Sequence, residues 1–353
     1  MIVKTDCKFF RGDVPCKPHK QYGYHCVDCP EYKNSDGKIL IIKLGAIGDV
    51  IRTTPLLRKL RAEFPNYQFF WLTYTPEILS SEWVNRILHP TIENLELLKN
   101  IEFNWLINLD KDALAVSLAN SINAKRKSGF TIDEFGHAKP ISNKAEHHKW
   151  LTGLFDDVSK ENTKNYMQEI FEICDYEFSG EEYVLELPEV QTNFDINKNK
   201  KVIGLNTGCG GRWTSRLWPT EYWIELAKNL LKENYEVILL GGEQENEKNK
   251  FIQKESGAKY FGYFNLQTFM NLVNNCDIVV TAVTMAMHIA IGLKKKLILF
   301  NNIFNKNEFY LYGRGKILEP DFECDCYYSP TCENSCMQYL KPERVLETIR
   351  KFS

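Results

Sequence analysis

The sequence predicts an α/β protein with two doubly wound domains, each built on a parallel sheet. Short apolar segments, typical of buried strands, alternate with segments of helical periodicity along most of the 353 residues. A polar stretch rich in Asn and Lys, residues 190–201, interrupts the alternation, which then restarts. We therefore expect one such domain at residues 37–189, a second at 190–353 and, before them, a Cys-rich extension at 1–36.

The expected elements of the first half follow from the hydrophobic pattern. Residues 38–44, KILIIKL, contain four consecutive apolar residues and predict a buried strand. The next segment, 48–63, has its apolar residues at helical spacing and predicts a helix. The remaining elements expected in this half are strands at 67–73 and 103–109 and a helix at 164–176.

The second half repeats the pattern more completely. Residues 202–206, VIGLN, predict a strand, and the helix predicted at 220–233 again has its apolar residues at helical spacing. VILLGG, 237–242, predicts a strand that ends at two glycines. In open parallel sheets, ligands bind at the carboxyl ends of the strands, so we expect a site there. The other expected elements are helices at 244–256, 266–275, 285–293 and 341–351 and strands at 277–280 and 296–300.

The composition is that of a globular protein, and we do not expect nucleic acid as a partner. Hydrophobic residues make up 44% of the chain, charged residues make up 25%, and the formal net charge is −2. This charge provides no general basic field for nucleic acid. No segment has the length of apolar sequence that a membrane span needs, and the first residues lack a secretory apolar region. We expect a cytoplasmic protein.

The chain contains 11 cysteines, eight of them near its two ends. In a reducing compartment, such clusters are more often metal sites than disulfides. The N-terminal group contains a C-x-x-C pair, and we expect it to hold a structural zinc or iron, with His19 and His25 as substitute ligands. The C-terminal group is the poorer candidate because its C-x-C pair is tight for one tetrahedral centre. The alternatives are reduced thiols, a second metal or a cluster that spans both ends. The two groups are Cys7, Cys16, Cys26 and Cys29, and Cys324, Cys326, Cys332 and Cys336.

The segment KLGAIGDVIRTTP, residues 43–55, places Asp49 behind a glycine-bearing turn at the end of the first predicted strand. An acidic residue there is either a helix cap or a catalytic group. The glycine pattern is neither G-x-G-x-x-G nor a Walker loop, so it does not predict nucleotide binding by either device.

Three loops of the second half carry groups suited to a nucleotide diphosphate. The loop at 206–219 contains three glycines, which leave backbone N–H groups accessible to phosphate, and two residues that offer charge and forked donors, Arg212 and Arg216. The turn at 239–247 is followed by carboxylates that can bind ribose hydroxyls, and the loop at 281–290 contains Thr284 and His288. Each loop alone also has a purely structural explanation. Because all three follow strands of one sheet, we expect them to form one phosphate site.

These motifs resemble those of family-9 glycosyltransferases, the ADP-heptose:lipopolysaccharide heptosyltransferase group. KILIIKLGAIGDVIRTTPLLRKLRAEFP is similar to the family opening, in which a strand precedes G-x-x-G-D-x-hydrophobic-x-T-T-P. The N-T-G loop, the basic residue before W-P, the G-G-x-x-E turn, the M-H-I-A segment and the Cys-bearing tail follow in the family's order. The likeness covers roughly residues 38–350.

The resemblance implies a GT-B fold, with two facing Rossmann-like domains, and an inverting glycosyltransferase that needs no catalytic metal. The sugar, by family default heptose from ADP-heptose, would move to a hydroxyl of a glycan or glycolipid such as lipopolysaccharide core, with peripheral association at the inner membrane face. The N-terminal domain would bind the acceptor and the C-terminal domain the nucleotide sugar. Asp49 would be the general base. The predicted acceptor-binding residues are Arg52 and Thr53, and the predicted donor-binding residues are Asn206, Thr207, Gly208, Arg216, Glu245, Thr284, Met285 and His288.

The chain departs from the family pattern at the third loop. Many heptosyltransferases read D-T-G-x-M-H where this chain has Val283 in place of the aspartate and Met285 in place of the glycine. Valine cannot bind a hydroxyl, so the donor sugar stays open. Arg216 also replaces the more usual lysine. Two alternatives remain, a glycosyltransferase that modifies protein and a GT-B-type binding protein without transfer activity.

Overall fold

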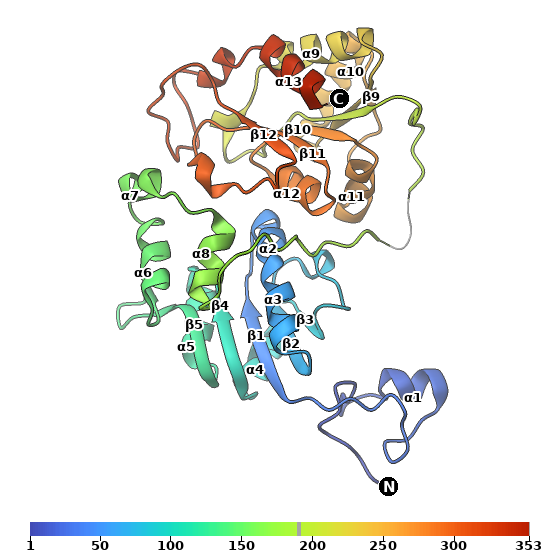
Figure 1. The fold of residues 1–353 in the computed structure, drawn as a ribbon, viewed down its shortest axis with the longest axis vertical. Helices are drawn as coiled ribbons and strands as arrows, with labels where there is room; N and C mark the ends of the chain where they lie inside the picture. Colours follow the sequence, from blue (N-terminus) through green and yellow to red (C-terminus); the bar gives the residue numbers. More distant parts are fainter. Residues whose placement is uncertain (189–191, 353) are drawn as a thin grey trace. The chain divides into compact units, whose positions relative to one another are not determined.

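The computed structural model describes residues 1–188 and 192–352 (Figure 1). The predicted division between residues 189 and 190 lies outside the described residues. The chain forms two compact units. The first unit holds Met1–Gly45, Pro55–His147 and Ile170–Tyr176. The second holds Ala46–Thr54, His148–Glu169 and the described residues from Glu177 onward.

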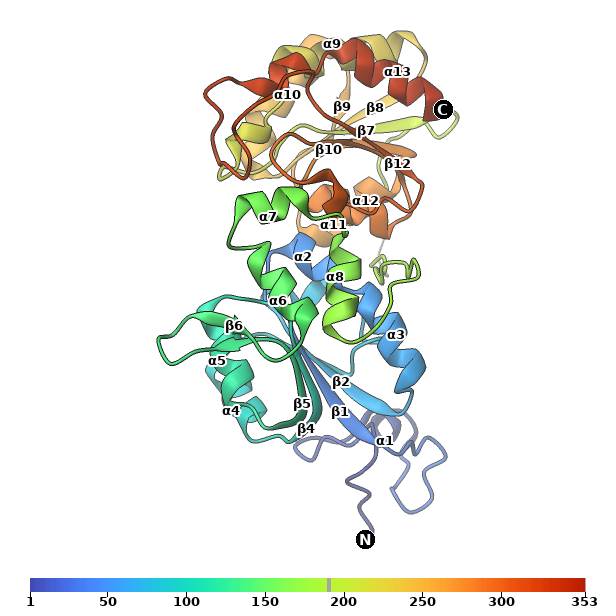
Figure 2. The ribbon, with the colours of Figure 1, turned by 60° about the vertical axis from the view of Figure 1, so that its left-hand side comes forward.

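The first unit is built on a six-stranded sheet with the order β3-β2-β1-β4-β5-β6. All pairs are parallel except β5 with β6. The buried residues Leu40 and Ile42 of β1 pack with α4 (Ile92–Lys99) and α5 (Ala113–Ser121) on one face, and α3 (Pro55–Glu63) lies on the other (Figure 2). The strands are β1 (Gly37–Ile42), β2 (Tyr67–Leu72), β3 (Arg86–Leu88), β4 (Phe103–Asn108), β5 (Ala124–Ile132) and β6 (Ala138–Pro140).

The second unit is built on a parallel six-stranded sheet, β12-β11-β10-β7-β8-β9. Counted from its own first strand, it has the same winding order as the first sheet. Helices α9 (Thr220–Lys232), α10 (Asn246–Ser256) and α13 (Pro342–Phe352) share one core with this sheet, and α11 (Leu266–Asn274) and α12 (Met285–Gly292) lie on the other face (Figure 1). The strands are β7 (Val202–Asn206), β8 (Glu236–Leu240), β9 (Lys259–Tyr260), β10 (Ile278–Ala282), β11 (Lys296–Phe300) and β12 (Gly315–Leu318).

Shorter elements complete the chain. The N-terminal extension contains one helix, α1 (Lys17–Tyr22), and the connection between the two sheets contains α6 (Lys144–Leu151), α7 (Asp156–Glu161) and α8 (Tyr166–Ile173). Within residues 1–188 and 192–352, no helix has the length and apolar character to cross a membrane. The single-turn 3-10 helices are η1 (Pro76–Ile78), η2 (Thr214–Arg216), η3 (Glu243–Glu245), η4 (Lys306–Glu308) and η5 (Cys336–Tyr339).

The helix predicted at 48–63 is two helices, α2 (Ile47–Thr53) and α3, which begins at Pro55. Proline has no N–H to continue the backbone ladder, so a break at this position is expected physically. The division has a consequence for the fold. Although α2 follows β1 in the chain, it belongs to the second unit, where it packs against α12. Gly48 permits this packing, because a Cβ there would lie only 2.6 Å from Cδ2 of His288.

Candidate active site

A cavity of about 700 Å³ opens in the second unit, at the carboxyl ends of β7, β8 and β10 and the N-terminus of α2. The three loops predicted to meet do meet here, and the helix that carries Asp49 joins them. The predicted residues that line the cavity are Asp49, Arg52, Asn206, Gly208, Arg216, Glu245, Thr284, Met285 and His288.

The other two predicted residues, Thr53 and Thr207, do not line the cavity. The Thr53 side chain is fully buried and donates a hydrogen bond to the carbonyl of Asp49 at 2.7 Å. The Thr207 hydroxyl donates to Oδ1 of Asn249 at 2.6 Å. Both hydroxyl groups therefore have a hydrogen-bond partner inside the protein.

Asp49 lies in the first turn of α2, with its side chain 34% exposed. Its Oδ2 accepts a hydrogen bond from the backbone N–H of Ala46 at 3.3 Å, and its Oδ1 is 2.8 Å from Nη2 of Arg52. A carboxylate oriented in this way at a cavity wall can accept a proton from a bound hydroxyl.

Asn206 joins two of the loops. Its amide nitrogen donates to the carbonyl of Gly208 at 3.1 Å and to Oγ1 of Thr281 at 2.9 Å. Thr284 is the N-cap residue of α12, but its side chain makes no capping hydrogen bond. The first N–H groups of a helix have no intrahelical acceptor, and they attract anions. The N-terminus of α12 is therefore suited to a phosphate group in the cavity.

Arg216 is 8% exposed and sits between these loops. Its Nη1 donates to the carbonyl of Val283, and its Nη2 donates to the carbonyl of Cys209 at 3.1 Å. Among the described residues, Nε has no hydrogen-bond partner, and the hydrogen bonds of the other two guanidinium nitrogens go to backbone carbonyls rather than to a carboxylate. Burial lowers the pKa of Arg216, which reflects the cost of a buried cation without a counter-ion. An anionic ligand would supply the missing charge.

Glu245 belongs to η3, after β8, and its Oε2 accepts a hydrogen bond from the N–H of Gly242 at 2.9 Å. A Cβ at Gly208 would lie 2.1 Å from the Glu245 carboxyl group. The glycine therefore allows two of the predicted loops to pack directly on each other. The side chain of Glu245 stays at the cavity wall, where it can accept hydrogen bonds from hydroxyl groups.

His288 is buried beneath the cavity wall, and its Nδ1 lies 3.3 Å from the hydroxyl of Tyr183. Burial, and secondarily the positive charge of Arg52, lowers the pKa of His288 to about 3. The imidazole is therefore neutral at physiological pH, and its chemical role is that of a hydrogen-bonding group rather than a cation.

Several cavity residues were not predicted. Trp213, Phe304 and Tyr328 form one aromatic wall, with ring centroids 5.4–6.0 Å apart. Phe264, Leu266 and Phe269 form a second apolar wall, and Glu308 is a further carboxylate at the edge. Trp213 lies within the predicted phosphate loop and could have been included. The others come from connections with no motif, and only the folded chain identifies them.

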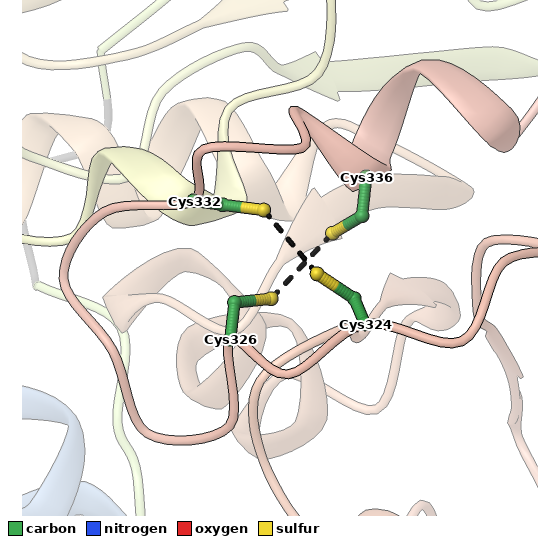
Figure 3. Close-up of side chains that lie close together, drawn as sticks. All are labelled: Cys324, Cys326, Cys332 and Cys336. Atoms are coloured by element: carbon green, nitrogen blue, oxygen red, sulfur yellow. Dashed lines mark hydrogen bonds between the residues drawn. The ribbon is translucent and has the colours of Figure 1, made fainter.

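The four C-terminal cysteines lie together, as Figure 3 shows. Their sulfur atoms are all within 4.8 Å of one another, with 3.5 Å between Cys324 and Cys332 and 3.7 Å between Cys326 and Cys336. Metal–thiolate bonds of about 2.3 Å in a tetrahedron place the sulfurs about 3.8 Å apart. The residues present therefore fit a tetrahedral zinc or iron.

The N-terminal cysteines do not form such a group, which reverses the order in which the sequence ranked the two clusters. Among the described residues, the His, Cys, Asp and Glu side chains that gather closely enough for a metal are the C-terminal four. The C-x-C pair is not too tight, because the chain turns between its two cysteines and both thiols point to one centre (Figure 3). The N-terminal four, Cys7, Cys16, Cys26 and Cys29, are each partly exposed thiols.

The cysteine tail is bonded to the turn that carries Arg216. Ser215 donates from its backbone N–H to the carbonyl of Pro330 at 3.0 Å and from its hydroxyl to the carbonyl of Ser329 at 2.6 Å. The amide of Asn302 donates to the carbonyl of Ser215 at 2.8 Å and to the sulfur of Cys336 at 3.3 Å. These hydrogen bonds connect the turn that carries Arg216 to the segment that carries the four cysteines.

Comparison with known sequences identifies the family of this chain. Residues 98–305 match the model of glycosyltransferase family 9 (heptosyltransferase). The match spans more than half of the chain, so the chain belongs to glycosyltransferase family 9, and the protein is a glycosyltransferase. One relative, lipooligosaccharide heptosyltransferase 2 of Campylobacter jejuni, is 25% identical over 339 residues, which cover 87% of this chain and 96% of the relative.

Solved structures confirm the predicted two-domain GT-B fold class. The ADP-heptose lipopolysaccharide heptosyltransferase II of E. coli aligns with a TM-score of 0.62 at 18% identity, over 89% of this chain and 98% of that one. The iron-containing dodecameric glycosyltransferase TibC of enterotoxigenic E. coli H10407 aligns with a TM-score of 0.57 at 11% identity, over 91% of this chain and 77% of that one.

Proposed function

We propose that this glycosyltransferase transfers a sugar, heptose from ADP-heptose as the first candidate, to a hydroxyl of a cell-surface glycan such as lipopolysaccharide core. The observation that carries the proposal is one cavity that combines a carboxylate, Asp49, with a buried cation, Arg216, which within the described part of the chain is hydrogen-bonded to carbonyls and not to a carboxylate. The relatives named above, lipopolysaccharide and lipooligosaccharide heptosyltransferases, favour this donor and acceptor.

The proposed reaction is a single inverting displacement. The acceptor hydroxyl oxygen forms a bond to the anomeric carbon of the donor, while the bond from that carbon to the diphosphate oxygen breaks. The hydroxyl proton goes to the carboxylate of Asp49, and the nucleoside diphosphate leaves with the bonding electron pair. Arg216 and the N-terminus of α12 would stabilise the charge that develops on the leaving diphosphate. No metal takes part in the proposed step.

The remaining assignments follow the walls of the cavity. Glu245 would bind the ribose hydroxyls, and the apolar wall of Phe264, Leu266 and Phe269 would face the base. Arg52, at the α2 end of the cavity, would face the acceptor. If the acceptor is a glycolipid, the enzyme would work at the cytoplasmic face of the inner membrane as a peripheral protein.

A pair of variants tests this proposal. Asp49→Asn should lower kcat by about two to four orders of magnitude, the contribution of a general base, while ADP still binds. Arg216→Ala should weaken ADP binding by about 1.5–3 kcal/mol, the scale of hydrogen bonds to charged groups. The assay is ADP release from ADP-heptose with heptose-deficient lipopolysaccharide as acceptor, and calorimetry measures ADP affinity.

The matched control is Arg212→Ala, because Arg212 is an exposed arginine of the same loop that does not line the cavity. It should keep full ADP affinity. An Asp49→Asn enzyme that retains most of its kcat would overturn the assignment of the base. ADP release that is stimulated by a polypeptide acceptor instead of the glycan would favour the protein-modifying alternative. Binding of ADP-heptose without any transfer would favour the binding protein.

We also propose that Cys324, Cys326, Cys332 and Cys336 hold one structural zinc or iron. Four protein thiolates would close the coordination shell, which is typical of structural rather than catalytic sites. The iron-containing glycosyltransferase of similar fold makes iron a metal to test beside zinc. By its hydrogen bonds to the turn at Ser215, this centre would hold one wall of the cavity in place.

A further inference from the structure

Arg52 is shared by two carboxylates of the cavity. Its Nη2 lies 2.8 Å from Oδ1 of Asp49 on its own helix. Its Nη1 lies 2.6 Å from Oε1 of Glu308, which is the last residue of η4 and far away in sequence. The guanidinium also lies over the ring of Tyr166, with 3.7 Å from its central carbon to the ring centroid. Each end of the guanidinium is thus committed to a different acid.

The charge of Arg52 is permanent. Burial lowers the pKa of Arg52, but the negative charges of Asp49 and then Glu308 outweigh burial, and the pKa is raised well above its ordinary value. Arg52 is therefore a permanent cation. Its electrostatic effect on Asp49 depends on how far Glu308 neutralises it.

Other titratable groups face this cluster from every side. Lys149, on α6, is paired with Glu169 at 2.5 Å and also interacts with Glu308 and Arg52. His288, on α12, is neutral because burial depresses its pKa, and burial raises the pKa values of Tyr183 and Tyr328, so both stay protonated. Among these neighbours, the acid that shares Arg52 with Asp49 is Glu308.

We propose that Glu308 is a positioning residue for the transfer reaction: it holds one end of Arg52, so that Arg52 contacts Asp49 with its other end alone and Asp49 remains an effective base. This inference rests on the proposed function, in which Asp49 accepts the proton of the acceptor hydroxyl. Glu308 itself need not touch the reacting atoms.

The direction of the effect follows from the charges. Without the negative charge of Glu308, Arg52 and Lys149 are less neutralised, and Arg52 can turn both of its terminal nitrogens toward Asp49. A carboxylate with a bidentate arginine partner holds its negative charge to lower pH and accepts a proton less readily. Loss of Glu308 should therefore weaken the base, and it should move the acid limb of the pH–rate profile to lower pH.

The experiment compares the pH dependence of kcat/KM for the wild type and Glu308→Gln, with ADP-heptose and heptose-deficient lipopolysaccharide. Glutamine keeps an oxygen that can accept from Arg52 and removes only the charge. We expect the plateau to fall about three- to tenfold and the acid limb to move down by about 0.5–1 pH unit. ADP affinity should stay within about twofold of the wild type, because Arg216 and α12 are unchanged.

The matched control is Glu182→Gln. Glu182 pairs with Arg314 at 2.6 Å in the same unit, with a side-chain exposure of 28% against 26% for Glu308, and it does not line the cavity. This control should leave the profile unchanged. If the plateau of kcat/KM falls in Glu308→Gln but the acid limb does not move, the substitution has only disturbed the structure, and the proposal is overturned. A pH profile of kcat/KM identical to that of the wild type would also overturn it. If Asp49→Asn is fully active in the same assay, the proposed function itself fails, whatever Glu308 does.

Discussion

Each end of this chain carries four cysteines, but the two groups differ in whether their thiols converge. The C-terminal four converge, with Cys326 and Cys336 buried against Ile303 in a small core. The N-terminal four stay apart along an extension whose regular structure is a single six-residue helix, α1. Similar composition therefore gives two different local structures.

The difference lies in what anchors each segment. The C-terminal tail runs between packed elements. The N–H of Tyr328 donates to the carbonyl of Ile303 at 2.8 Å, and the turn at Ser215 holds the carbonyls of Ser329 and Pro330. The N-terminal extension has few such anchors, for example the hydrogen bond from Lys8 Nζ to the carbonyl of Pro65 at 2.7 Å. The four thiols converge where surrounding elements hold the backbone in place. The spacing of cysteines in the sequence does not predict which segment is held in this way.

The largest expected effect comes from breaking the C-terminal centre. Cys326→Ser/Cys336→Ser should remove the metal completely and lower the melting temperature of the protein by about 10 °C. The physical reason is that metal binding contributes directly to folding free energy, and about 1 kcal/mol corresponds to about 2–4 °C in domains of this size. Elemental analysis of freshly purified protein and scanning calorimetry measure the two quantities. A metal-free wild type would contradict the centre.

A smaller effect is expected on ligand binding. Removal of the metal by a chelator should weaken ADP binding about tenfold, or about 1.4 kcal/mol, because the tail would no longer hold the turn of Arg216. Calorimetric titration before and after chelation measures the change, and added zinc or iron should restore the affinity. If protein that has demonstrably lost its metal keeps its ADP affinity, the cysteine centre does not affect ligand binding in the cavity, and the prediction is wrong.

The smallest effect is expected at the other end of the chain. Cys26→Ser/Cys29→Ser should leave metal content and ADP affinity unchanged and should change stability by less than about 0.5 kcal/mol, because these thiols are partly exposed and do not belong to the cysteine group that fits a metal. The same elemental analysis provides the measurement. If this variant loses one metal per chain, the N-terminal metal site that the cysteine spacing predicts would be supported instead.

The elements that sequence predicted are those with a strong local signal. Most residues of these strands are apolar, because strands covered on both faces bury most of their side chains; they are β1, β2 and β4 of the first sheet and β7, β8, β10 and β11 of the second. β5 was not predicted. It begins Ala-Lys-Arg-Lys, and only its later residues are buried. Strands near a sheet edge need less apolar sequence, so their hydrophobic pattern is weak.

By itself, the sequence determined the fold class, the three loops at strand ends and the place of Asp49 at the start of a helix, because strand burial, glycine turns and helix starts are local properties. Tertiary structure alone decided which residues meet. It placed α2 against α12, gave Arg52 a second carboxylate in Glu308, turned Thr53 and Thr207 inward, and gathered the C-terminal rather than the N-terminal thiols. These outcomes depend on contacts between residues up to 256 positions apart, and no local pattern encodes them.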